Sequence, residues 1–222
     1  MPIHDQRIVL FTPRQVDAGT QHIASAGAAA LAAKGARLFG VFKPVIGLSV
    51  NRAVVISEWP DETQAAAWGH VALDGLDGVR TESRELWEPT SIPRAGESPT
   101  EMGGVYSHRA FDILEPDWPR FLELSETAWG NFEAAHPTIV KGFWKSRTPP
   151  APGQLRVRLM AWYETLDAWE RSRWWNPAAR EGSADAFARF RERSQMLQDT
   201  GVSILTRVPL AGETGGAATA VN

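Results

Sequence analysis

The sequence of 222 residues contains no cysteine. This absence excludes a disulfide framework, a thiolate metal site, a cysteine nucleophile and a cysteine-ligated iron–sulfur cluster. The five histidines form neither a His-x-His nor a His-Glu-x-x-His motif, and no acidic loop has calcium-binding spacing. A phosphate-cradling loop and a Gly-x-Ser-x-Gly turn are also missing. The sequence therefore predicts no metal, and it gives no support to a flavin or nicotinamide cofactor or to a hydrolase triad.

Runs of positive charge and long apolar runs are also missing. The formal net charge is −3, and no segment is rich in Lys and Arg, so nucleic acid is not an expected partner. No apolar stretch approaches the length needed to cross a bilayer, and the N-terminus lacks the pattern of a signal peptide. We therefore expect a cytoplasmic protein that binds neither nucleic acid nor a membrane.

Tryptophan, by contrast, is abundant, with ten residues against two tyrosines. Most of the tryptophans lie in the second half of the chain, which suggests that this half carries a pocket, because indole rings serve both cores and ligand sites. Three of them recur at helical spacing and are predicted to be packing residues: Trp169, Trp174 and Trp175.

The two halves of the chain repeat one pattern. The segment Phe39-Gly40-Val41-Phe42 aligns with Lys141-Gly142-Phe143-Trp144, and each half shows strand, helix, two strands, helix, strand. A sheet with helices on one face has a second apolar face, which pairing with a copy would bury. We therefore predict an α+β fold of two tandem ferredoxin-like βαββαβ units whose antiparallel sheets pair into an α+β barrel.

The expected boundaries follow from composition. Residues 1–89 form the first unit, and residues 104–210 form the second. Between them, residues 90–103 are rich in Pro, Gly, Ser and Thr and are predicted to be a linker. Gly201 is expected to end the last helix before a closing strand, and residues 211–222 are expected to be a disordered tail. Two fused units can close one barrel, so a monomeric barrel or a homo-oligomer is expected.

Three segments of the second half carry a resemblance to a known family. They are Tyr106-Ser107-His108-Arg109-Ala110-Phe111, residues 159–171, and Gly201-Val202-Ser203-Ile204-Leu205 after a Phe-x-x-Phe-Arg helix. They resemble the NIPSNAP family and, more broadly, the dimeric α+β barrel superfamily, which includes antibiotic-biosynthesis monooxygenases, polyketide cyclases and heme enzymes. The resemblance covers the second half well and the first half only by pattern. Its motifs are structural, so it implies a fold and no catalytic residues.

Candidate site residues follow from the alternation of side chains along strands. Tyr106 and His108 share one face of the first strand of the second unit. One face of the third strand carries Arg156, Arg158, Met160 and Trp162. The opposite face is aliphatic and suits the helix layer, so these four side chains are expected to face the barrel interior.

Arginines in an enclosed space require carboxylates or an anionic ligand. In the functional interpretation, Tyr106 and His108 are the acid–base groups, and Arg158 or Arg156 holds a carboxylate or enolate. Trp144 and Trp162 are apolar walls, with Met160 beside them in the substrate-binding set. In the alternative interpretation, the arginines pair with Glu or Asp of the other unit, and His108 is a satisfied core residue.

The leading functional hypothesis is a cofactor-independent enzyme that acts by acid–base chemistry on a small, partly apolar carbonyl or aromatic metabolite. A cyclase, isomerase, lyase or monooxygenase would each suit such a site. One alternative is a non-catalytic protein that binds a hydrophobic metabolite or a partner. The other is a heme-binding protein with His108 or His136 as the axial ligand, which rests on fold analogy.

Overall fold

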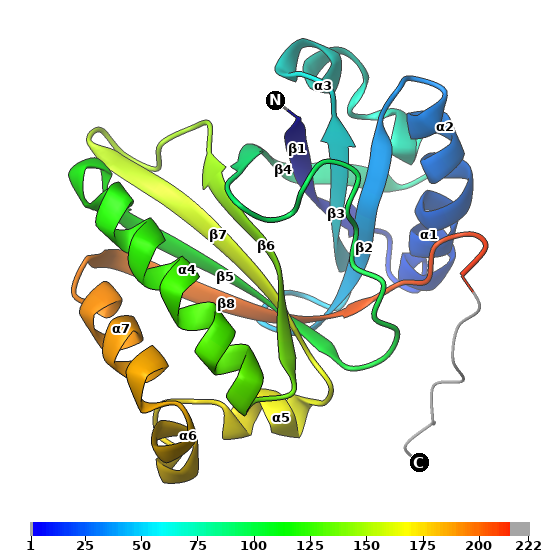
Figure 1. Cartoon of the computed structure of the whole chain (residues 1–222). Coiled ribbons are helices and arrows are strands. Elements are labelled where there is room, and N and C mark those ends of the chain that lie inside the picture. The colour runs from blue at the N-terminus through cyan, green and yellow to red at the C-terminus, as the bar shows by residue number, and fades with distance from the viewer. Residues whose placement is uncertain (1, 214–222) are drawn as a thin grey trace.

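In the computed structural model, which describes residues 2–213 apart from the side chain of Glu181, eight antiparallel strands close a barrel, with the helices packed outside it (Figure 1). The strands lie around the barrel in the order β1-β3-β2-β8-β5-β7-β6-β4. This arrangement confirms the predicted fold. The strands are β1 (Ile3–Phe11), β2 (Arg37–Ile46), β3 (Arg52–Trp59), β4 (Val79–Pro89), β5 (Val105–Leu114), β6 (Thr138–Ser146), β7 (Gln154–Tyr163) and β8 (Leu197–Arg207).

The helices form one layer over each unit. Over the first unit lie α1 (Val16–His22), the π-helical turn η1 (Ile23–Gly27), α2 (Ala28–Ala32), α3 (Glu62–Trp68) and the 3-10 turn η2 (Val71–Leu73). Over the second unit lie η3 (Glu115–Asp117), α4 (Trp118–Ala135), α5 (Leu166–Arg171), α6 (Pro177–Gly182) and α7 (Ala184–Ser194). Within the described residues, no helix is both long enough and apolar enough to span a lipid bilayer.

Matching N-caps begin the helix after the third strand of each unit. Asp61 Oδ1 accepts a hydrogen bond from the Gln64 backbone N–H at 2.8 Å, and Thr165 Oγ1 accepts one from Ala168 N–H at 2.9 Å. Each side chain satisfies an N–H group that has no partner within the first helical turn. The repeat is therefore visible in the caps as well as in the order of elements.

The clearest trace of the repeat is a pair of glycines. A bulge interrupts the β2–β3 ladder just before Gly40, and another interrupts the β6–β7 ladder just before Gly142. At each glycine, an added Cβ would strike the aromatic ring two residues further on, which is Phe42 in the first unit and Trp144 in the second. The missing side chain lets each ring fold back into the barrel.

Apolar side chains fill the barrel as well as the space under the helices. Inside it, Phe39, Phe42, Trp87 and Leu205 form part of one buried cluster. Burial of large apolar side chains of this kind typically contributes ~1.5–3 kcal/mol each. Both faces of each sheet are therefore cores, as expected for two sheets that pair and also carry helices.

Residues 90–103 do more than connect the units. The Tyr106 hydroxyl donates to the Glu101 carbonyl at 2.9 Å, and Trp162 Nε1–H donates to the Gly103 carbonyl at 3.1 Å. Lys141 forms an ion pair with Glu101. The predicted linker is thus a strap that packs on side chains of the second unit.

Three sequence expectations need correction or qualification. Trp174 and Trp175 are 68% and 50% exposed, so the prediction that they are packing residues was wrong. Helix α5 ends before them, and the new helix at Pro177 leaves both on an outward connection. Gly201 does not end the last helix but lies within β8, because pairing with β5 extends that strand back to Leu197. Of the predicted tail, residues 214–222 lie outside the described residues, and Glu213 pairs with Arg207 at 2.7 Å.

Candidate functional site

The side chains selected from the sequence do meet on the interior face of the barrel. Tyr106, Trp144 and Met160 are buried in the interior cluster, and Trp162 packs against it. His108 is 4% exposed and lies opposite Met160 across the β5–β7 ladder. The interior is therefore closely packed at these residues.

Both interior arginines are neutralised by carboxylates. Arg156 donates two hydrogen bonds of 2.7 Å to Asp112 and lies 3.3 Å from Glu85. Arg158 pairs with Glu85 at 2.8 Å. Glu85 belongs to β4 of the first unit, as the alternative interpretation expected, whereas Asp112 lies on β5 of the same unit as the arginines. These contacts leave neither charge in need of an anionic ligand.

Burial keeps the interior acid–base candidates uncharged. The pKa of His108 is lowered well below its usual value by burial and by the nearby Arg158. Burial also raises the pKa of Tyr106, whose hydroxyl already donates to the strap. His108 Nε2 has no hydrogen-bond partner among the described residues. The catalytic roles of both residues stay predictions.

Neither histidine proposed as a heme ligand fits that role here. His108 is enclosed by the packed interior. His136 Nε2 lies 3.1 Å from Ser183 Oγ, and its ring lies 4.6 Å from Phe132, so the nitrogen that would bind iron is already engaged. Among the described side chains, no three His, Asp or Glu are grouped in a way that could hold a metal ion.

A different group of polar side chains lies under the helices of the second unit. It consists of Arg109 on β5, Arg173 after α5, and Arg193 on α7, and we call it the arginine cluster. Arg173 lowers the pKa of Arg109 in addition to burial, and Arg109 does the same to Arg193, so the three charges act on one another. None of them forms an ion pair with a carboxylate in the described part of the chain.

Arg193 is the most deeply buried of the three charges. Its guanidinium lies 4.8 Å from the ring centroids of Phe111 and Phe190, and Nη1 donates to Ser125 Oγ at 3.0 Å. Burial lowers the pKa of Arg193 to about 9, so it remains protonated at neutral pH. The cation–π contacts stabilise the charge but do not cancel it.

Hydrogen-bond donors without acceptors surround the same cluster. Arg173 Nη2 donates to the Tyr163 hydroxyl at 2.8 Å, while the proton of that hydroxyl has no acceptor among the described side chains. Trp169, whose ring lies 5.1 Å from the Arg173 guanidinium, has a buried Nε1–H without a partner there. The half-buried Arg109 guanidinium makes no hydrogen bond to any described residue. Buried donors are normally satisfied, so this region calls for an acceptor.

The first unit has an arginine at the same repeat position, and there a carboxylate neutralises its charge. Arg7 is the repeat counterpart of Arg109, because both pair with equivalent residues on the neighbouring strands. Asp5, with a fully buried side chain, accepts from both Arg7 and Arg84 at 3.0 Å. In the second unit, Ser107 stands in place of Asp5 and Val202 in place of Arg84. The carboxylate that balances Arg7 thus has no equivalent beside Arg109.

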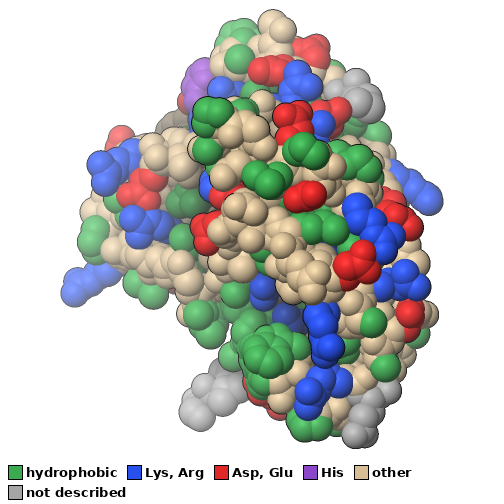
Figure 2. Space-filling model, turned by 90° about the vertical axis from the view of Figure 1, so that its left-hand side faces the viewer, with side chains coloured by type: hydrophobic (Ala, Val, Ile, Leu, Met, Phe, Trp, Pro, Cys, Tyr) green, Lys and Arg blue, Asp and Glu red, His purple; other side chains and the backbone are tan. Residues whose placement is uncertain are grey.

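Three carboxylates of the covering helices are engaged with other side chains. Glu192 pairs with Arg120 at 2.6 Å, Asp185 with Arg189 at 3.1 Å, and Glu170 accepts from Trp175. Figure 2 faces the side on which Figure 1 draws α4 and α7, and shows hydrophobic side chains gathered near the lower end beside a row of Lys and Arg. That is the end where α5 and α6 lie, next to the arginine cluster.

His136 lies at the edge of this region. Burial and Arg173 lower its pKa, so its imidazole is neutral at pH 7 and able to accept a proton.

Sequence reasoning had placed Arg109 on the helix-covered face and gave it no role. The available signal was the change from Asp5 to Ser107 between the aligned repeats, which removes a charge while keeping the arginine.

Comparisons with known proteins support the fold. No protein-family model matches the chain, and no curated protein matches it. Among solved structures, an anthrone oxidase-like protein has a TM-score of 0.61 at 11% identity, over 96% of this chain and 97% of that one. A candidate monooxygenase from Lactobacillus acidophilus NCFM has a TM-score of 0.55 at 10% identity, over 93% of each chain.

A chlorite dismutase from Candidatus Nitrospira defluvii has a TM-score of 0.56 at 8% identity, over 94% of this chain and 91% of that one. These neighbours are ferredoxin-like proteins of the dimeric α+β barrel type. At such low identity, the likeness shows the fold alone.

Proposed function

We propose that the chain is an enzyme that uses acid–base chemistry on a small, partly apolar carbonyl or aromatic metabolite with an anionic oxygen, held at the arginine cluster. The observation that carries the proposal is Arg109, a half-buried cation with no ion pair in the described residues, at the position where Arg7 is neutralised by Asp5. An unpaired charge under a helix layer is costly, so retaining it favours a ligand that supplies the missing negative charge.

The proposed roles follow from the atoms that lack partners. Arg109 and Arg173 would hold the anionic oxygen, and Tyr163 and Trp169 would donate to it or to a neighbouring carbonyl. Donors fixed in advance around a developing oxyanion are among the most effective catalytic devices. The Phe rings against which Arg193 packs would provide apolar contact with the rest of the molecule.

His136 is the proposed general base. It is neutral at pH 7 because burial and Arg173 lower its pKa. Since the Ser183 hydroxyl donates to the Ala179 carbonyl, His136 Nε2–H donates to Ser183 Oγ, and Nδ1 is the nitrogen that can accept a proton. A base of this kind typically contributes ~10²–10⁴-fold to a rate. The neighbouring cations also favour an enolate over its neutral acid, so proton removal next to a carbonyl is the step that this arrangement would promote.

Binding and catalysis can be tested separately. Benzoate should bind more tightly than benzyl alcohol in calorimetric titrations, and Arg109→Met should weaken benzoate binding by ~10-fold or more. Arg7→Met is the matched control and should bind benzoate normally as long as it is folded. Equal benzoate affinity in the wild type and Arg109→Met would refute the anion site.

Phenylpyruvate, which combines an aromatic ring, a carboxylate and an acidic C–H, serves as the catalytic probe. Accelerated exchange of that proton in D2O, followed by NMR, should fall by ~10²-fold or more in His136→Gln. Benzoate binding without any exchange would instead favour the non-catalytic binding protein considered above.

A second candidate is the barrel interior, with Tyr106 and His108 as acid–base groups. Its support is that His108 Nε2, both ring nitrogens of His4 and Nε1 of Trp144 are buried without described partners. Loss of exchange activity in His108→Ala and Tyr106→Phe, with normal folding and intact activity of His136→Gln, would favour this site over the arginine cluster.

Three further predictions accompany the proposal. They are membership of the NIPSNAP family, a cytoplasmic location, and a state that is either a monomeric barrel or a homo-oligomer. The fold neighbours named above are in keeping with a small-molecule enzyme, but they support it only by analogy.

A further inference from the structure

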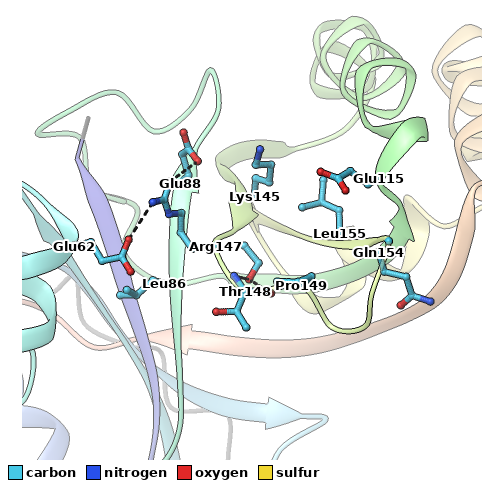
Figure 3. A pocket seen from close by; sticks show the side chains of 12 residues that line it. Glu62, Leu86, Glu88, Glu115, Lys145, Arg147, Thr148, Pro149, Gln154 and Leu155 are labelled. Carbon is cyan, nitrogen blue, oxygen red and sulfur yellow. Dashed lines mark hydrogen bonds and ion pairs between the residues drawn. The ribbon is translucent and has the colours of Figure 1, made fainter.

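A cleft of about 370 Å³ lies between the two units, away from the arginine cluster (Figure 3). Leu86 and Glu88 of β4 line one side, and Lys145 of β6 and Leu155 of β7 line the other. Its volume falls in the range of small-molecule sites, which begins near ~300 Å³. The cleft exists only because the two units are joined along β4 and β6.

The charges on the first-unit side of the cleft are already satisfied. Arg147 lies 3.1 Å from Glu62 and 3.5 Å from Glu88, as the dashed lines in Figure 3 show. This group bridges α3, β4 and the end of β6. These ion pairs hold the side chains of one wall in place, so the charges that could bind a ligand lie on the opposite wall.

The opposite wall carries one cation and one anion that do not pair. Lys145 forms no ion pair or side-chain hydrogen bond with any side chain that the structure describes, and the same holds for the Glu115 carboxylate. Figure 3 shows the two side chains on the same wall, with Leu155 beside them and no interaction drawn between them. The cleft is thus lined by two opposite charges, a half-buried lysine and an exposed glutamate, and by the apolar side chain of Leu155.

Lys43 of the first unit occupies the repeat position of Lys145 and can be compared with it. Lys145 follows Gly142 by three residues, as Lys43 follows Gly40 in the first unit. Lys43 Nζ lies 2.8 Å from Asp17 Oδ1, so the first unit neutralises its lysine internally. The second unit leaves the equivalent lysine free to pair with a ligand, at a place where a cavity is present.

We propose that this cleft binds a small zwitterion, of which a free α-amino acid is the simplest example. The ligand carboxylate would pair with Lys145, its ammonium group with Glu115, and its apolar side chain would lie against Leu155 and Leu86. A molecule with its two charges only a few bonds apart can bridge a cation and an anion that share a wall without touching. Each of these contacts is a charge-assisted hydrogen bond.

The test is a titration of the full-length protein with leucine, followed by NMR chemical shifts and by calorimetry. Binding is expected near a Kd of ~1 mM, and both Lys145→Met and Glu115→Gln should weaken it by ~10-fold or more. Lys43→Met is the matched control and should bind leucine within about twofold of the wild type, because its lysine lies outside the cleft. Arg109→Met should also leave leucine binding unchanged, which separates this site from the proposed active site.

Several outcomes would overturn the proposal. One is no shift of the cleft resonances up to ~10 mM leucine, ten times the expected Kd. Another is leucine binding that survives both Lys145→Met and Glu115→Gln. Acetate binding as tightly as leucine would show a simple anion site, and methylammonium binding as tightly would show a simple cation site. Either result would contradict recognition of a zwitterion.

Discussion

The two units of the barrel share a backbone but treat their cations differently. In the first unit, Asp5 lies between Arg7 and Arg84, and Asp17 pairs with Lys43. In the second unit, the counterparts Arg109 and Lys145 have no ion pair in the described part of the chain. Because fold and register are the same, folding alone does not require this difference. This difference is what supports the proposal that ligands bind at cations of the second unit.

The largest expected effect on stability concerns the glycine that each unit has two residues before a buried aromatic ring. Gly142→Ala should destabilise the protein by ~3 kcal/mol or more, because the new Cβ would overlap the Trp144 indole, which is buried in the barrel. Gly40→Ala should cost less, about 1–2 kcal/mol. There the Phe42 ring would be 2.7 Å from the new atom. Urea unfolding of both variants measures the difference.

Gly130→Ala is the control for the glycine pair. Gly130 lies in α4 with nothing within 4 Å of an added Cβ, so alanine should stabilise the helix by ~0.5–1 kcal/mol. If Gly40→Ala and Gly142→Ala lowered the free energy of unfolding by the same amount, the aromatic rings would be free to move away from the new Cβ in both units.

A second difference between the units concerns acid stability. His4 stands at the repeat position of Tyr106, and burial lowers its pKa to about 4 from 6.5. Between these two pH values, the unfolded chain holds a proton that the folded chain does not, so stability falls as the pH decreases from 6.5 to 4. The loss due to His4 should be ~3 kcal/mol.

His4→Phe measures this contribution in unfolding curves recorded from pH 4 to 7. The stability of the variant should fall less steeply with decreasing pH than that of the wild type. Some decline should remain, because the pKa values of His108 and His136 are also lowered. Tyr106→Phe should leave the slope unchanged, because the tyrosine does not titrate in acid. Identical slopes for His4→Phe and the wild type would contradict the buried, neutral state of His4.

The paired arginines give an effect of opposite sign in the two units. Arg7→Met should destabilise the protein by ~2 kcal/mol, because it leaves the buried Asp5 with Arg84 as its only ion-pair partner among the described residues. Arg109→Met leaves no carboxylate unpaired and removes a repulsion, so its stability should equal or exceed that of the wild type. Parallel urea unfolding curves give both values.

The stability of Arg109→Met tests the proposed function more directly than that of Arg7→Met. A loss of ~2 kcal/mol or more in Arg109→Met would mean that its charge is already satisfied in the folded protein. That result would remove the main support for the proposed function, whatever happens at Arg7.

The fold was readable from the sequence because it depends on patterns that repeat. Alternation along the strands, the N-caps Asp61 and Thr165, and the aligned glycines all survive in both halves. The candidate site was not readable in the same way. Strand alternation placed Tyr106 and His108 on one face, but it could not show that the partners of the interior arginines are Asp112 and Glu85.

The arginine cluster depends on residues far apart in the chain. Arg109, Arg173 and Arg193 come together only when α5 and α7 pack on β5, and no spacing along the sequence encodes this. The exposure of Trp174 and Trp175 was missed for a related reason. Helical spacing identifies a face only where the helix continues, and α5 ends at Arg171.

The final prediction converts the second unit into a copy of the first. Ser107→Asp places a carboxylate at the position of Asp5, beside Arg109, where it should stabilise the protein by ~1 kcal/mol and weaken benzoate binding by ~10-fold. Ser107→Asn has a similar size and no charge, so it should retain benzoate binding. If both variants bind benzoate equally well, Arg109 is not the anion-binding group. If only the aspartate variant loses binding, a single residue accounts for the difference between a scaffold unit and a ligand-binding unit.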